Sequence, residues 1–284
     1  MRAKTDASRS QVPSLAAVRG FVFDIDGTLA LADKNLGGYE ALPGAVELVT
    51  LLRKRQVPTV AFTNGTTKTP AELSKALCAI GMAFDETQAM TPISVAVDYF
   101  KRKKYKRVLV LGVEGVWRPI QEAGIEVILS PKGCDDADAV LIGWYPQFTL
   151  ADIDAACRAV WGGAALYTAS TAAYVASREG RTLGISGAIS AAVRNVTGKR
   201  AMVVGKPSLQ ALQCASRRLG VAPADMAIVG DDASLENAMA HRCGALSVAV
   251  HTGLGGASSF AALPIAIRPH LSLSGIDKLL DLMA

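Results

Sequence analysis

Short apolar runs alternate with segments of helical periodicity along nearly the whole 284-residue chain. Residues 20–24 form the first run and residues 57–65 the second, and apolar residues at helical spacing follow each of them. This alternation is typical of parallel sheets whose strands are connected by helices. We therefore expect an α/β fold.

The alternation restarts in the middle of the chain, as though a second unit begins there. Its apolar runs cover residues 107–112, 125–129, 138–144 and 165–170. The most economical arrangement is a Rossmann-like parallel-sheet core built from residues 18–87 and 199–284. Residues 88–198 then form an inserted α/β domain. The polar residues 1–17, of mixed charge, are expected to be a flexible tail.

Composition limits the classes of function. Half of the residues are hydrophobic and 19% are charged, which indicates a substantial core. The net charge of +5 suits an anionic substrate but does not indicate a nucleic-acid partner. The five cysteines lack the spacing of a zinc site or disulfide framework, and no run is long enough for a secretory signal or membrane span. We expect a cytoplasmic protein without a membrane partner.

Polar side chains follow four of the expected strands. In chain order they are Asp24, Asp26, Thr63, Asn64, Lys206, Asp231 and Asp232. Since ligands of open parallel sheets bind beyond the carboxyl ends of the strands, we expect these side chains to converge at one edge. Carboxylates with one lysine and small hydrogen-bond donors suit Mg²⁺ together with a phosphate group.

Each of these features also has a plain structural explanation. The Asp-Gly sequence after the first strand favours a turn, and Lys206 before a proline is compatible with a surface lysine. Asp231 or Asp232 can cap the helix that follows. The order and the strand-end placement of all four features favour a shared site.

The motifs FDIDGTL, FTNG, GKP and VGDD occur in this order, and the sequence in this respect resembles the haloacid dehalogenase superfamily of phosphotransferases. The long insertion between the second and third motifs is most similar to the NagD-like branch, which includes p-nitrophenyl phosphatase, phosphoglycolate phosphatase and pyridoxal phosphate phosphatase. The resemblance implies that the inserted domain is a cap that closes over the site.

The resemblance also implies roles for the site residues. Asp24 becomes the nucleophile that forms an aspartyl-phosphate, and Asp26 the general acid and then the base, for which a raised pKa is expected. Thr63 and Asn64 fall on phosphate-binding positions. Lys206 falls on the lysine that steadies the nucleophile and the transferred phosphoryl group.

The metal ligands implied are the Asp24 carboxylate, the backbone carbonyl of Asp26 and the Asp231 carboxylate. Family members often carry a further aspartate five positions after the one at Asp231, where this chain has Glu236. Whether Asp232 or Glu236 supports the metal is left open.

The resulting hypothesis is a Mg²⁺-dependent hydrolase of small phosphomonoesters of the nucleotide, sugar phosphate or phosphoglycolate type. The alternatives are a phosphomutase and a non-catalytic module that binds phosphorylated ligands. The expected partner is a small phosphorylated metabolite, and a homodimer through the cap is compatible with the resemblance.

Some residues of the inserted domain are weaker candidates. Trp144 and Tyr145, residues 168–174 and Arg178 can face a ligand or pack within the cap. The basic run at residues 101–107 is interpreted as a solvated helix end. The histidines lack metal-ligand spacing: His241, His251 and His270.

Overall fold

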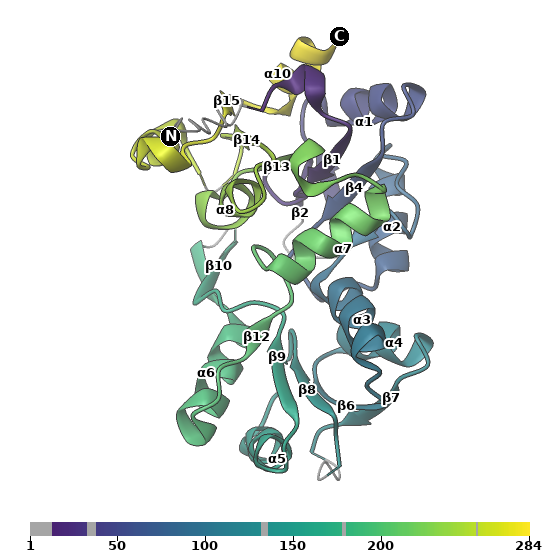
Figure 1. Ribbon diagram of the computed structural model, residues 1–284, viewed down its shortest axis with the longest axis vertical. Coiled ribbons are helices and arrows are strands. Elements are labelled where there is room, and N and C mark those ends of the chain that lie inside the picture. Colours follow the sequence, from purple (N-terminus) through teal and green to yellow (C-terminus); the bar gives the residue numbers. More distant parts are fainter. Residues whose placement is uncertain (1–12, 33–37, 132–135, 178–179, 254) are drawn as a thin grey trace, which may run out of the picture.

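The chain forms two α/β units stacked along the long axis of the molecule, which confirms the expected fold class (Figure 1). The computed structural model describes residues 13–32, 38–131, 136–177, 180–253 and 255–284. Most of the expected tail and Arg178 lie outside the described residues. None of the helices in these ranges has the length and apolar character needed to cross a membrane.

The first unit contains a parallel sheet of six strands in the order β15-β14-β13-β1-β4-β5. These strands are β1 (Gly20–Phe23), β4 (Thr59–Phe62), β5 (Ala89–Met90), β13 (Met226–Gly230), β14 (Leu246–Val250) and β15 (Leu271–Leu273). The strand β1 pairs in parallel with β13 on one side and with β4 on the other. Both ends of the chain therefore contribute to one sheet.

Successive residues of β1 are buried on opposite faces of this sheet. Phe21 and Phe23 pack in one cluster and Val22 in the other, as the two-residue period of a strand requires. The first face is covered by α1 (Ala45–Lys54), α2 (Pro70–Ala79) and α10 (Ile276–Met283), and the second by α7 (Leu209–Leu219) and α8 (Ala238–His241). Burial on both faces explains why these strands are continuous apolar runs.

The second unit contains a parallel sheet of five strands in the order β12-β9-β8-β6-β7. These strands are β6 (Arg107–Leu111), β7 (Glu126–Leu129), β8 (Ala139–Ile142), β9 (Ala165–Thr168) and β12 (Met202–Val203). One face is covered by α3 (Pro92–Lys103) and α4 (Glu114–Glu122), and the other by α5 (Leu150–Trp161) and α6 (Ile185–Thr197). Thr149 and Asp152 form a capping box at the start of α5.

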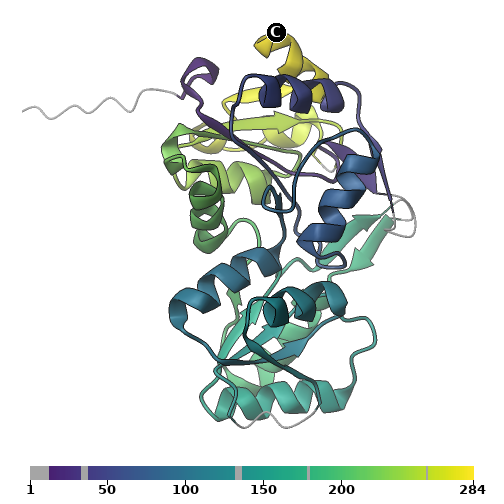
Figure 2. The same cartoon turned by 90° about the vertical axis from the view of Figure 1, so that its right-hand side faces the viewer.

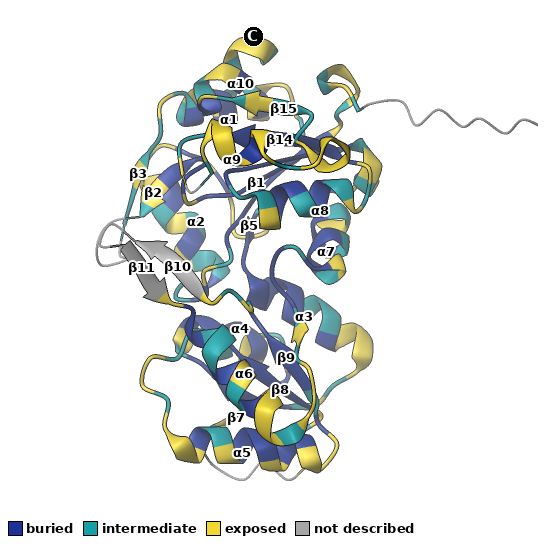
Figure 3. Cartoon of the chain, turned by 90° about the vertical axis from the view of Figure 1, so that its left-hand side faces the viewer, coloured by how far each residue is buried: buried dark blue, intermediate teal, exposed yellow. Residues whose placement is uncertain are grey.

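Smaller elements complete the described chain. They are the antiparallel pair β2 (Ala30–Ala32) and β3 (Tyr39–Ala41), the hairpin β10 (Tyr174–Ser177) and β11 (Gly180–Leu183), α9 (Ala257–Ala261), the 3₁₀ turns η1 (Leu15–Ala17), η2 (Pro223–Asp225) and η4 (Ile265–Ile267), and the π-helix η3 (Ala233–Asn237). Helix α5 alternates between buried and exposed residues, as expected for a helix that covers one face of a sheet (Figure 3).

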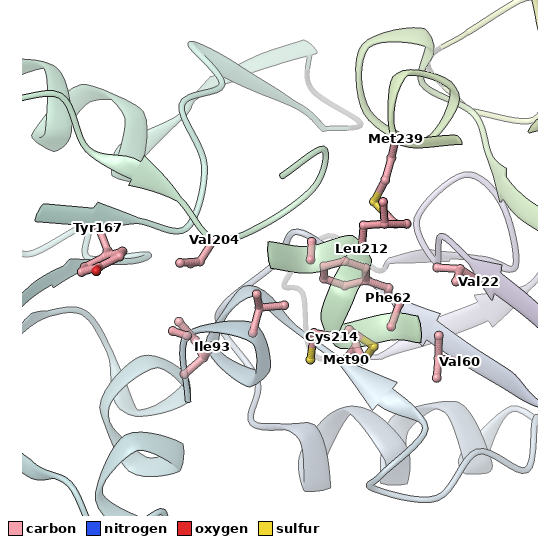
Figure 4. Packing of buried hydrophobic residues seen from close by; sticks show 14 of the residues in the cluster. Val22, Val60, Phe62, Met90, Ile93, Tyr167, Val204, Leu212, Cys214 and Met239 are labelled. Atoms are coloured by element: carbon pink, nitrogen blue, oxygen red, sulfur yellow. The ribbon is translucent and has the colours of Figure 1, made fainter. Parts of the chain in front are cut away.

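One buried cluster runs through both units. Val22 on β1 and Tyr167 on β9 belong to it, and Ile93 on α3 lies between the two sheets (Figure 4). Helix α3 packs against α4 of the second unit and α7 of the first, and Figure 2 shows it at the junction. The second unit therefore packs against the first through a continuous apolar core.

The carboxyl ends of both sheets face each other across the junction. Trp144 follows β8, and its backbone N–H donates to Thr66 Oγ1, in the loop after β4, at 3.0 Å. A Cβ at Gly115, at the start of α4, would lie 2.6 Å from the carbonyl oxygen of Thr66. Because ligands bind at the carboxyl edges of parallel sheets, this arrangement places a site between the two units.

The strand composition of the units differs slightly from the expected boundaries. Residues 89–90, in β5, pair with β4 in the first sheet, whereas residues 202–203, in β12, pair with β9 in the second. Strands of two residues are too short to carry a recognisable periodicity. Lys206 therefore follows a strand of the second sheet, not of the first, and reaches the shared site because the two carboxyl edges face each other.

Candidate active site

Asp24 is the first residue after the central strand β1. Its backbone N–H donates to the carbonyl of Val229 on β13 at 2.9 Å, and the residue is 7% exposed. One carboxylate oxygen contacts Lys206 Nζ, and the other accepts a long hydrogen bond of 3.4 Å from Thr28 Oγ1. These contacts hold a buried carboxylate in a fixed orientation at the carboxyl edge.

Asp26 lies two residues further along the same loop and accepts a hydrogen bond of 3.2 Å from Thr63 Oγ1. The residue is exposed to solvent, but many protein atoms lie around its carboxyl group. This desolvation raises the pKa of Asp26 to about 6, and the charge of Asp24 adds to the effect. The Thr63 hydrogen bond and the Lys206 charge oppose the shift. Asp26 thus holds a proton more readily than an ordinary aspartate.

Lys206 is almost completely buried and forms ion pairs with Asp24 and, at 2.6 Å, with Glu236 Oε1. Burial alone lowers the pKa of a lysine, but the two carboxylates outweigh it and raise the pKa of Lys206. Lys206 therefore stays protonated and supplies a fixed positive charge beside Asp24.

Asn64 binds the backbone of Lys206 with both ends of its side-chain amide. Asn64 Oδ1 accepts from Lys206 N at 2.8 Å, and Asn64 Nδ2 donates to the Lys206 carbonyl at 3.1 Å. A Cβ at Gly205 would lie 2.5 Å from Asn64 Oδ1, so a glycine is needed for this close approach. The Asn64 side chain therefore positions Lys206, and the phosphate contact expected for Asn64 stays a prediction.

Glu236 was one of two residues left open as a support for the metal. It lies in the π-helix η3 and is buried beside Lys206, and burial raises its pKa while Lys206 opposes the shift. Asp232 caps the same helix by accepting from Ser234 N at 2.6 Å. The Asp232 side chain thus has a capping role, as one reading of the sequence predicted.

Asp231 follows β13, the strand paired with β1, so it lies at the same sheet edge as Asp24. It is 4% exposed. A Cβ at Gly27 would lie 2.9 Å from Asp231 Oδ2, and one at Gly253 would lie 2.0 Å from the same atom. The Asp231 carboxylate therefore lies against two glycine backbones. Gly253 could not be singled out from the sequence, although a cluster of glycines after an expected strand was a usable signal.

The donor set fits Mg²⁺ better than a transition metal. Within the described residues, no three or more His, Cys, Asp or Glu side chains are grouped to hold a metal. Mg²⁺ needs only one or two carboxylates, with water and phosphate oxygens as further ligands. Lys206 pairs with Asp24, and Asp231 is a second buried carboxylate at the same sheet edge, so a divalent cation held by Asp24 and Asp231 would balance their negative charge.

The candidate ligand contacts in the second unit are partly used for packing. Trp144 and Tyr145 pack against the apolar cluster of the second sheet. In residues 168–174, Thr168 Oγ1 donates to the Ser170 carbonyl at 3.0 Å, so this loop is held by its own hydrogen bonds. Of the basic run at 101–107, all but residues 105 and 107 are exposed, as expected for a solvated helix end.

Two family models match the chain: haloacid dehalogenase-like hydrolase over residues 21–126 and HAD-hydrolase-like over residues 203–279. Together they include the segments that carry Asp24, Asn64, Lys206 and Asp231.

Several curated proteins are similar over most of the chain. Chronophin from Rattus norvegicus is 28% identical and covers 94% of this chain and 88% of its own length. The 5′-nucleotidase YutF from Bacillus subtilis is 27% identical over 83% of this chain and 88% of its own. The sugar-phosphatase AraL from the same organism is 27% identical over 82% of this chain and 83% of its own.

Solved structures share the fold. The p-nitrophenyl phosphatase from Archaeoglobus fulgidus superposes with a TM-score of 0.83 at 23% identity, covering 93% of this chain and 99% of its own. NagD from E. coli K-12 gives 0.79 at 21% identity, over 92% and 98%. Glycerol phosphate phosphatase Rv1692 from Mycobacterium tuberculosis, in complex with magnesium, gives 0.80 at 24% identity, over 93% and 76%.

Proposed function

The chain belongs to the haloacid dehalogenase superfamily and is a phosphatase, and we propose that it is a Mg²⁺-dependent hydrolase of small phosphomonoesters that acts through an aspartyl-phosphate on Asp24. The observation that carries the proposal is the pairing of two unlike carboxyl groups in one loop. Asp24 forms an ion pair with Lys206, whereas the pKa of Asp26 is raised.

The two carboxyl groups suit a double displacement. Asp24 attacks phosphorus, the bond from phosphorus to the leaving oxygen breaks, and Asp26 gives its proton to that oxygen. Asp26, now ionised, takes a proton from water as the water attacks the aspartyl-phosphate. The bond from phosphorus to Asp24 breaks, and phosphate leaves. The raised pKa of Asp26 supports both steps because it lies close to neutral pH.

The remaining site residues supply positive charge and fix the positions of the reacting groups. Lys206 orients Asp24 and offsets the charge of the phosphoryl group, and Asn64 fixes the backbone of Lys206. Thr63 is proposed to donate to a phosphate oxygen, for which its hydroxyl would rotate away from Asp26. Asp24, Asp231 and the backbone carbonyl of Asp26 would hold Mg²⁺, which supplies Lewis-acid neutralisation of the phosphate charge.

The substrate is proposed to be a small metabolite of the nucleotide, sugar phosphate or phosphoglycolate type. Relatives named as a 5′-nucleotidase and a sugar-phosphatase support this range. Neither nucleic acid nor a membrane is proposed as a partner, and a homodimer through the second unit remains part of the proposal. A phosphomutase would use the same carboxyl pair, but would return the phosphoryl group to an organic hydroxyl and release no inorganic phosphate.

Removal of the metal gives the primary test. Purified protein with Mg²⁺ should hydrolyse p-nitrophenyl phosphate and members of a phosphorylated-metabolite panel, and EDTA should abolish the release of inorganic phosphate. Excess Mg²⁺ should restore it, whereas Ca²⁺ should not, because its larger and more flexible coordination suits an in-line displacement poorly. Transfer of phosphate to a second sugar without release would indicate a mutase, and binding without turnover across the panel would indicate a binding module.

The positioning role of Asn64 gives a second prediction. Asn64→Ala removes both hydrogen bonds to the Lys206 backbone, so Lys206 and Asp24 lose their alignment. We expect kcat for p-nitrophenyl phosphate to fall by about 10- to 100-fold. Asn195→Ala, at an exposed position of α6, is the matched control and should leave kcat unchanged. Equal kcat values for the two variants would contradict the role of Asn64.

A further inference from the structure

The loop that follows β14 encloses Asp231 with glycine backbone. A Cβ at Gly253 would lie 2.0 Å from Asp231 Oδ2, and a Cβ at Gly255 would lie 2.2 Å from the Asp231 carbonyl oxygen. A Cβ at Gly27, in the loop after β1, would lie 2.9 Å from the same Asp231 Oδ2. Three glycines from two loops thus leave just enough room for one buried aspartate.

The same loop is tied to the loop that carries the nucleophile. Thr252 Oγ1 donates to the Gly27 carbonyl at 2.6 Å. A Cβ at Gly27 would also lie 2.8 Å from Gly253 Cα, so the two backbones are in direct contact. Gly27 has a φ of 84°, in the left-handed region that favours glycine, and this turn sets the course of the loop after Asp24 and Asp26.

We propose that Thr252, Gly253 and Gly255 are positioning residues that fix the Asp231 carboxylate relative to Asp24 and thereby pre-organise the metal site. The inference rests on the proposed function, in which these two carboxylates hold Mg²⁺. Metal affinity depends on the relative placement of the ligands, and groups that hold ligands in place commonly change affinity by about 10- to 100-fold when removed. The glycines act by providing space, and Thr252 acts by joining the two loops.

Gly253 allows a clean test because the atoms nearest to an added Cβ belong to the Asp231 carboxylate and to the facing Gly27 backbone. Its φ lies outside the left-handed region, so alanine can adopt its backbone conformation. A methyl group at Gly253 overlaps Asp231 Oδ2 and must displace the carboxylate. Gly256 is three residues further along the same loop, has a φ of −87°, and has nothing within 4 Å of an added Cβ. Gly256→Ala is therefore the matched control.

The experiment measures Mg²⁺ binding to the full chain by isothermal titration calorimetry, together with the thermal midpoint in EDTA. We expect Gly256→Ala to bind Mg²⁺ as the wild type does, and Gly253→Ala to bind it at least about tenfold more weakly. Both variants should keep thermal midpoints in EDTA close to that of the wild type. Wild-type affinity in Gly253→Ala would overturn the inference alone, whereas absence of Mg²⁺ binding by the wild type would overturn it together with the proposed function.

Thr252 provides a second arm that does not depend on how Gly253→Ala folds. Thr252→Val removes the hydroxyl that donates to Gly27, and Thr252→Ser keeps it. We expect Thr252→Val to weaken Mg²⁺ binding and Thr252→Ser to restore most of the affinity. Equal affinities for the valine and serine variants would contradict a positioning role for this hydrogen bond.

Discussion

Asp24→Asn is expected to lower kcat for phosphomonoester hydrolysis by about 10⁴- to 10⁶-fold, the scale seen when a nucleophile is removed from a catalytic unit. A neutral amide oxygen is a poor nucleophile toward phosphorus, and the remaining carboxyl of Asp26 points to Thr63. The measurement is steady-state hydrolysis of p-nitrophenyl phosphate with saturating Mg²⁺. Acid quenching with ³²P-labelled substrate should trap an acyl phosphate on the wild type and none on the variant.

A surface substitution of the same kind is the control for Asp24→Asn. Asp154 pairs with Arg158 on α5, and its side chain is 62% exposed, so Asp154→Asn should leave kcat unchanged. The fold should survive Asp24→Asn because Lys206 keeps its second partner, Glu236. Full turnover in a folded Asp24→Asn variant would show that Asp24 is not the nucleophile.

The family and the α/β architecture could be predicted from the sequence, because the information that specifies them is local. Apolar runs and helical periodicity identify strands and helices one segment at a time. The four motifs likewise lie in short stretches, and both the superfamily and the fold class are confirmed. The two strands that lie across the expected domain boundaries, β5 and β12, are two residues long and are defined by their neighbours in space.

The roles of the individual site residues could not be predicted because they depend on contacts between segments that are distant in the sequence. Asn64 and Lys206 are 142 positions apart, and their paired hydrogen bonds exist only once the two sheets face each other. From the sequence, Glu236 and Asp232 are equal candidates for the site. In the structure, Glu236 lies in the π-helix η3, a kind of element frequently found at functional sites, and is a buried partner of Lys206, whereas Asp232 caps the helix. Gly253 has no functional side chain, and its role is to leave room for the Asp231 carboxylate.

The second large effect is expected for Lys206→Met, which should destabilise the protein as well as inactivate it. Asp24 and Glu236 would lose the positive charge that each contacts, and removal of one partner from a buried ion pair costs about 3–5 kcal/mol. Loss of a charge that stabilises the transferring phosphoryl group lowers kcat by about 10²- to 10³-fold. Urea unfolding in EDTA measures the first effect, and hydrolysis of p-nitrophenyl phosphate measures the second.

A double variant separates the charge effect from the packing effect. Lys206→Met with Glu236→Gln removes one of the two carboxylates that Lys206 neutralises, so it should recover part of the free energy of unfolding and none of the activity. Lys278→Met, at an exposed lysine paired with Asp277 and Asp281, is the matched control and should leave the free energy of unfolding nearly unchanged. Equal stability of Lys206→Met and the control would contradict a buried charge cluster at this site.

The pH dependence of Lys206→Met provides the sharpest version of this prediction. In the wild type, burial raises the pKa of Glu236 and Lys206 opposes the shift. Without Lys206 the folded-state pKa of Glu236 rises further above its unfolded value, so the folded state binds a proton that the unfolded chain releases. The stability contributed by that proton is present at low pH and is lost as the pH rises through the folded-state pKa. The destabilisation of Lys206→Met relative to the wild type should therefore be smaller at pH 5 than at pH 9. An equal difference at both pH values would mean that Glu236 does not take up a proton when its buried partner is removed.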